Sequence, residues 1–107
     1  MVARYNRPGE NIDFLNTGTE PIQEGDVVDL GDHGIGVAGA TIEAGAVGAV
    51  WVEGVFMFPK AAGALALGDE VYWNATAQNV TATGDMAIGW VVQPAGAADA
   101  TALVKIG

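Results

Sequence analysis

The sequence predicts an all-β fold: a small, single-domain antiparallel β-barrel or sandwich of about eight short strands, with little or no helix. Val, Ile and Thr make up 26 of the 107 residues, and their branched side chains suit a pleated surface better than a helix. The 16 glycines are spread along the chain, so they interrupt almost every window long enough for a helix. Turn residues recur about every ten residues, which is the spacing typical of strands in barrels and sandwiches.

Four strands are expected in the N-terminal half of the chain. The first alternates polar and apolar side chains, which is the pattern of a half-buried strand. The second follows a Glu-Gly-Asp turn, and the third is rich in glycine. The fourth is the most apolar segment of the chain and ends at Pro59-Lys60. The expected strands cover residues 11–15, 27–30, 35–39 and 47–58.

The segment 47–58 is apolar on both faces of the expected strand. Trp51, Val55 and Met57 alternate with Val50, Val52, Phe56 and Phe58. Such a strand is covered on both faces, or a bulge at Gly54 switches the inward face. A strand that crosses the core of a closed barrel and a strand that is covered by a partner both fit this pattern. If a partner covers it, the oligomer interface is predicted to use Trp51, Val55 and Met57.

Four further strands are expected in the C-terminal half, at 71–73, 78–81, 86–92 and 101–106. Each follows a turn that contains Gly, Asn, Asp or Pro. The turn and strand start at 67–71 resemble those at 24–28. This similarity indicates reuse of one hairpin geometry, but it is too short to predict a repeat.

The charge distribution predicts a short arm ahead of the β domain. The chain carries 4 basic and 13 acidic residues, a net charge of −9, yet Arg4 and Arg7 both lie in the first seven residues. We expect residues 1–10, which include the Pro8-Gly9 pair, to form a flexible N-terminal arm. Residues 11–107 are expected to form a single β domain. The arm could lie on an acidic neighbouring surface, or it could be a frayed terminus without a role.

Composition excludes several classes of function. The absence of cysteine excludes disulfides and thiolate metal sites, and a strongly acidic body makes direct nucleic-acid binding improbable. No apolar run approaches the length of a membrane span, and the N-terminus has no hydrophobic signal core. No membrane partner and no signal peptide are therefore expected.

No catalytic, cofactor or metal site is predicted. The string at 34–39 matches G-x-G-x-x-G, but it is followed by a poor helix former, whereas a dinucleotide site needs a helix there. His33 beside Asp32 is interpreted as a turn histidine, because the chain has no serine or cysteine nucleophile. The acidic residues at 24–32 lack the spacing of a calcium loop. The Asn-x-Thr sequences at 74–76 and 79–81 are interpreted as turn and strand residues.

Several short motifs resemble those of the tailed-phage capsid cement, or head decoration, proteins. They are VEGVF at 52–56, PKAAG at 59–63, LGDEVYWN at 67–74, VTATG at 80–84 and the Ile-Gly pair at 88–89. The resemblance runs from about Gly25 to the C-terminus. It implies a mostly-β domain that binds the outside of a phage head, and it carries over no catalytic residue. Related decoration proteins commonly associate as trimers.

The resemblance implies that this is a structural protein of the virion and not an enzyme. The expected partner is the major capsid protein of a phage, with a homotrimer forming at least on the capsid. The expected location is the outer capsid surface, after synthesis in the host cytoplasm. Stabilisation would come from many copies that bind across the joints between capsomers. The arm residues Arg4, Tyr5, Arg7 and Pro8 are predicted to contact the capsid, by adding a strand to an exposed sheet edge.

Two other functions fit parts of the sequence. A small barrel could bind a glycan or another small molecule on Trp51, Trp73 and Trp90, although tryptophans within strands are more often core residues. A hydrolase that uses Asp32, His33 and a threonine is the weaker alternative.

Overall fold

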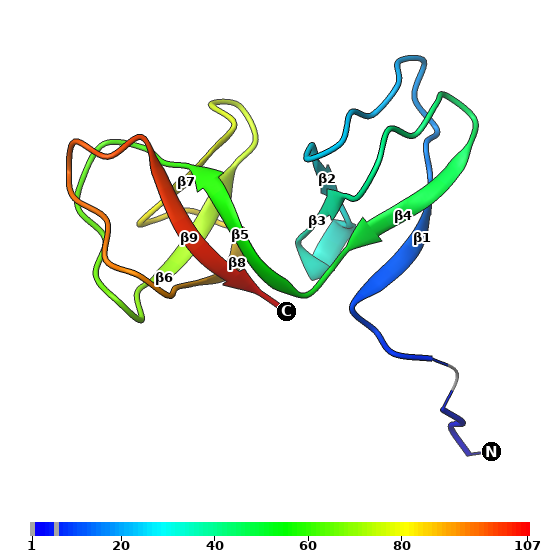
Figure 1. The fold of residues 1–107 in the computed structure, drawn as a ribbon, viewed down its shortest axis with the longest axis horizontal. Coiled ribbons are helices and arrows are strands. Elements are labelled where there is room, and N and C mark those ends of the chain that lie inside the picture. Colours follow the sequence, from blue (N-terminus) through cyan, green and yellow to red (C-terminus); the bar gives the residue numbers. More distant parts are fainter. Residues whose placement is uncertain (1, 6) are drawn as a thin grey trace. The chain divides into compact units, whose positions relative to one another are not determined.

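The protein is all-β, as predicted. The computed structural model describes residues 2–5 and 7–107, and in this part of the chain nine strands form two antiparallel sheets (Figure 1). The only helical element described is one short 3₁₀ turn, η1 (Gly31–His33). Each sheet has two edge strands, so neither closes into a complete barrel. Among the described residues, no helix has the length and hydropathy that a membrane span requires.

The first sheet has the strand order β1-β4-β3-β2. Its strands are β1 (Asn11–Leu15), β2 (Val27–Asp29), β3 (Ile35–Ala38) and β4 (Val47–Trp51). The β1–β4 register runs from the Asn11–Trp51 pair to the Leu15–Val47 pair. Val50 on β4 is fully buried, because alternate side chains along a strand point to opposite faces.

The second sheet has the strand order β5-β9-β8-β6-β7. Its strands are β5 (Gly54–Pro59), β6 (Glu70–Asn74), β7 (Asn79–Thr81), β8 (Ala87–Val91) and β9 (Thr101–Ile106). The β5–β9 pairing is unbroken from Gly54–Ile106 to Pro59–Thr101. A parallel bridge between Lys60 and Val80 brings β7 to the end of β5, so the two edges of this sheet approach each other at one point.

The chain groups into two compact units, one of residues 1–28 and 36–53 and the other of residues 29–35 and 54–107. Each unit has its own buried apolar residues. In the first they include Val28, Val37, Ile42 and Val50, and in the second Phe58, Val71, Val80, Val91, Val104 and Ile106.

The apolar segment 47–58 forms two strands instead of the single strand predicted. β4 ends at Trp51 and β5 begins at Gly54, whose φ of 133° suits glycine. β4 pairs in the first sheet and β5 in the second. Exposure still alternates in a regular way, since Val50 and Phe58 are buried whereas Trp51, Val55 and Met57 are exposed. The segment therefore has one buried face and one exposed face.

The two sheets share one strand order. When β7 is left out, the first strand of each half-chain pairs with the last, the last with the third, and the third with the second. Thus β1, β2, β3 and β4 correspond to β5, β6, β8 and β9. The register aligns Val50 with Val104, both fully buried, and the Ile-Gly pair at 35–36 with the pair at 88–89. β7 has no counterpart, because η1 takes its place between β2 and β3.

One hydrogen-bonded turn occurs four times, twice in each half. The backbone N–H groups of Asp26, Ala46, Asp69 and Asp99 donate to the carbonyl oxygen three residues earlier, at 3.0 to 3.1 Å. In three of the turns the aspartate Oδ2 also accepts the N–H of that earlier residue, at 2.8 to 2.9 Å. In three of the four turns, the residue directly before the N–H donor is a glycine with positive φ, namely Gly25, Gly45 or Gly68. The similarity noticed in the sequence between 24–28 and 67–71 is therefore part of a repeated structure.

Candidate interaction surfaces

The outward face of the second sheet carries exposed apolar side chains. Val55 and Met57 on β5 are 53% and 66% exposed, and Trp90 on β8 is 44% exposed. The register places Lys105 of β9 between Val55 and Trp90, and Leu103 of β9 opposite Met57. We call Val55, Met57, Trp90 and Leu103 the apolar strip. Large apolar patches on a soluble protein mark contacts with other molecules.

The first sheet has its own exposed apolar residues. Trp51 is 36% exposed, and the neighbouring pair Leu15 and Val47 is 50% and 62% exposed. Trp51 packs over the backbone of Gly39, where an added Cβ would come within 3.0 Å of the indole nitrogen. Of the three residues predicted for an oligomer interface, Val55 and Met57 therefore share one face of a strand, whereas Trp51 belongs to the other unit. Sequence reasoning missed Leu103, although alternation within 101–106 could have placed it on this face.

The described arm residues precede the first strand and are exposed. Residues 2–5 and 7–10 lie outside strands, and Tyr5 is 84% exposed; Met1 and Asn6 lie outside the described residues. The Arg7 guanidinium is 3.9 Å from the Asp13 carboxylate, and both side chains are largely exposed. An ion pair of this kind contributes little to stability. The structure thus leaves Arg4, Tyr5, Arg7 and Pro8 accessible to another chain.

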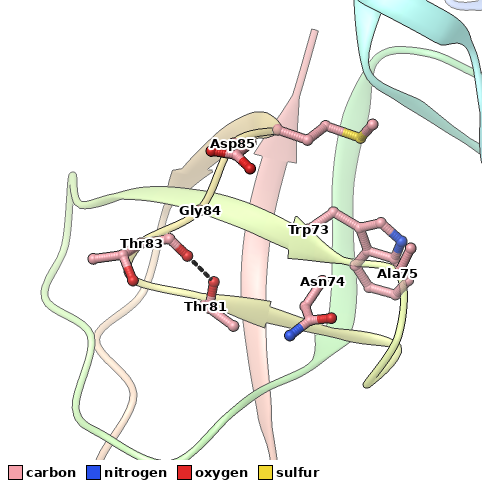
Figure 2. A pocket seen from close by; sticks show the side chains of 8 residues that line it. Trp73, Asn74, Ala75, Thr81, Thr83, Gly84 and Asp85 are labelled. Atoms are coloured by element: carbon pink, nitrogen blue, oxygen red, sulfur yellow. Dashed lines mark hydrogen bonds between the residues drawn. The ribbon is translucent and has the colours of Figure 1, made fainter.

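The hollow shown in Figure 2 lies beside Trp73 and the loop at 81–86. Two of its polar side chains are engaged locally: the Thr81 hydroxyl donates to the Thr83 carbonyl oxygen, and Asn74 Oδ1 accepts the N–H groups of residues 76 and 77. The Trp73 ring packs against Phe58 inside the unit, with 6.0 Å between ring centroids. Trp90 lies on the opposite face of the same sheet, so these two tryptophans cannot line one binding pocket.

The candidate chemical residues lie in strands and turns where the structure describes them. The string at 34–39 lies on β3 and leads into a turn, not a helix. His33 and Asp32 are exposed on η1. Asp29 Oδ1 accepts the Gly31 N–H at 2.7 Å, as Asp26 does for its own turn. Within residues 2–5 and 7–107, no three His, Asp or Glu side chains gather closely enough to hold a metal ion.

Two buried polar residues occupy corresponding positions after the first strand of each half. Asn16 Nδ2 donates to the carbonyl oxygens of Glu20 and Ile42, at 2.9 and 3.0 Å. Lys60 Nζ donates to the carbonyl oxygens of residues 61 and 99, at 2.9 and 3.2 Å. They are 3% and 8% exposed. Each buried side chain thus finds its hydrogen-bond partners among loop carbonyls, which is a structural role.

The outward face of the second sheet also carries one perturbed ionisable group. The Tyr72 hydroxyl donates to Glu70 Oε1 at 2.9 Å. This hydrogen bond and the negative charge of Glu70 raise the pKa of Tyr72 above its ordinary value. The shift opposes ionisation and supplies no reactive nucleophile, because an activated phenol needs a lowered pKa.

A family model described as phage cement protein matches residues 6–106, nearly the whole chain. This confirms the resemblance inferred from the motifs. No curated protein and no solved structure matches the sequence.

Proposed function

Because this chain belongs to the phage cement protein family, we propose that it binds the outer surface of an assembled phage head and stabilises the joints between capsomers. The family match over residues 6–106 is the observation that carries the proposal. Membership is consistent with a structural component of the capsid.

The stabilisation needs no chemical reaction. A protein that binds only the assembled lattice shifts the equilibrium toward that lattice by mass action. A copy that lies across a joint must lose its contacts before the capsomers separate, and many such copies act together. We therefore propose a role without catalysis or cofactor, and a net charge of −9 suits a surface that must not bind the packaged DNA.

Two groups of residues are proposed as contacts. The apolar strip around Val55 and Met57 would lie between copies of the protein on the head, in a homotrimer as the family resemblance implies. The exposed arm with Arg4, Tyr5, Arg7 and Pro8 would extend from the β domain of residues 11–107 to a neighbouring chain at the joint. The major capsid protein is the proposed partner of the assembled form, on the outside of the virion.

Co-sedimentation with purified heads tests this function. The protein should sediment with expanded heads and stay in solution with unexpanded proheads, because only the expanded lattice presents the joint. Decorated heads should also release their DNA at a higher temperature than undecorated heads. Equal binding to both forms, or no binding to either, would contradict the proposal.

A further inference from the structure

We propose that the N-terminal arm of one copy adds a strand to the free edge of β2 in a second copy. The proposal rests on a strand position that is filled in the second half of the chain and open in the first. It does not depend on capsid binding, because it concerns two copies of the purified protein.

The internal comparison identifies the open position. In the second sheet, β7 pairs with β6 and buries Val80 completely. β2 is the counterpart of β6, yet in the described residues it has β3 as its only sheet neighbour. The first sheet therefore lacks a fifth strand at the edge where the second sheet has one.

Burial differs between the halves in the way that a missing strand predicts. Phe58, near the end of β5, is 2% exposed, and β7 reaches this end of the strand through the Lys60–Val80 bridge. Its counterpart Phe14 on β1 is only half-buried. A strand added beside β2 would cover the first half as β7 covers the second.

The β2 edge has backbone groups available for pairing. The Asp26 carbonyl accepts the Ala38 N–H, and the Leu30 N–H donates to the Gly34 carbonyl, at 2.9 and 2.8 Å. Since hydrogen bonding alternates along a strand, the N–H and C=O groups of Val27 and Asp29 point away from β3. An unpaired edge of this kind is a template for strand addition.

Charge identifies the arm as the occupant. Residues 8–53 contain nine acidic side chains and no Lys or Arg, and Glu20, Glu24 and Asp26 precede β2. The arm carries Arg4 and Arg7 and no acidic residue before Glu10. An arm that pairs with the β2 edge would bring its arginines to this acidic segment.

Geometry selects a second copy over the chain's own arm. The Glu10 carbonyl accepts the Val52 N–H at 2.9 Å, which fixes the end of the arm beside β4. The open position lies four strand spacings from β1, about 19 Å across the sheet. Even fully extended, the five residue steps from Tyr5 to Glu10 span at most about 18 Å, so the chain's own residues 3–5 cannot all lie along this edge. The arm of another copy has no such restriction.

Disulfide trapping tests the pairing, because the natural chain has no cysteine. Two single-cysteine variants are mixed and oxidised. One carries Val27→Cys on β2. The other carries a cysteine on the arm, at Ala3→Cys, Arg4→Cys or Tyr5→Cys, so that neighbouring registers of the pairing are each tested. Adjacent strands place Cβ atoms within disulfide range, so we expect a covalent heterodimer. Leu67→Cys, on an exposed turn of the second half, serves as the matched control for Val27→Cys.

A cross-link at Val27→Cys well above that at Leu67→Cys supports the proposal. Charge reversal with Arg4→Glu and Arg7→Glu should then lower its yield roughly tenfold. The proposal is overturned if no arm variant cross-links above the control. It is also overturned if a chain carrying both cysteines closes the disulfide within itself at high dilution.

Discussion

Replacing both β5 residues of the apolar strip should separate association from folding. Val55→Asp with Met57→Asp introduces two charges on one face of the second sheet, where the side chains are already 53% and 66% exposed. Because most of each side chain is in water, the variant should lose only about 1 kcal/mol of folding stability per site, largely from the low β-propensity of aspartate. Circular dichroism should show a β spectrum and a melting temperature lowered by several degrees.

The effect on association should be much larger. Full burial of Val or Met contributes about 2 kcal/mol, and the exposed fractions leave roughly 1 kcal/mol at each side chain for a partner to bury. Losing both contacts, about 2 kcal/mol, weakens each interface about 30-fold, and burying an unpaired carboxylate weakens it further. Light scattering and analytical ultracentrifugation should therefore show monomers at concentrations where the natural chain is oligomeric.

Leu67→Asp provides the matched control for this experiment. Leu67 is 61% exposed, lies in a turn and not on the sheet face, and its replacement adds a carboxylate outside the apolar strip. It should associate as the natural chain does. Association of the double variant at the strength of this control would refute the assignment of the strip. An unfolded double variant would show that the strip belongs to the core.

Three further predictions concern stability and ionisation. Asn16→Asp keeps the shape but replaces the amide donor by a carboxylate that is buried beside the carbonyl oxygens of Glu20 and Ile42, so chemical denaturation should show a loss of about 2–4 kcal/mol. Gly89→Ala should cost about 3 kcal/mol or more, because its Cβ would overlap a β9 carbonyl. Gly96→Ala should melt like the natural chain, because its Cβ would meet only the Asp99 side chain, at an ordinary contact distance of 3.5 Å. Tyr72 should ionise above its ordinary pKa, and Glu70→Gln should lower that pKa in an ultraviolet titration. Since folding raises this pKa, its contribution to stability is complete below the ordinary pKa near 10 and is lost as pH rises through the folded value.

The sequence was sufficient for the fold class and for most strands, because alternation and turn residues are local signals. It was not sufficient at 52–54. There the chain passes from one sheet to the other without a turn cluster, and only Gly54 marks the break. The candidate surfaces were likewise predictable from local alternation but not from the pairing of distant strands. Exposed side chains at Val55 and Met57 follow from their alternation with Phe56 and Phe58, whereas Trp90 joins them only through the β8–β9–β5 pairing, which is not local.

The internal repeat was harder to predict, since the two halves share geometry more than residue identity. The buried Asn16 corresponds to the buried Lys60, and two different donors perform the same task. The fourth turn has Ala98 where the others have glycine, so a sequence pattern based on Gly-Asp detects only two of the four turns.

The matched strand orders point to the origin of the chain. A half of about fifty residues is close to the lower size limit for independent folding, so an ancestral gene encoding one half would have needed association to make a stable product. Duplication and fusion of that gene would have placed two copies of the half in one chain. Afterwards one half was free to acquire the hairpin that contains β7, while the other kept a short connection. Because of this asymmetry, one small chain would carry two sheets of common origin that differ in strand number and in their free edges.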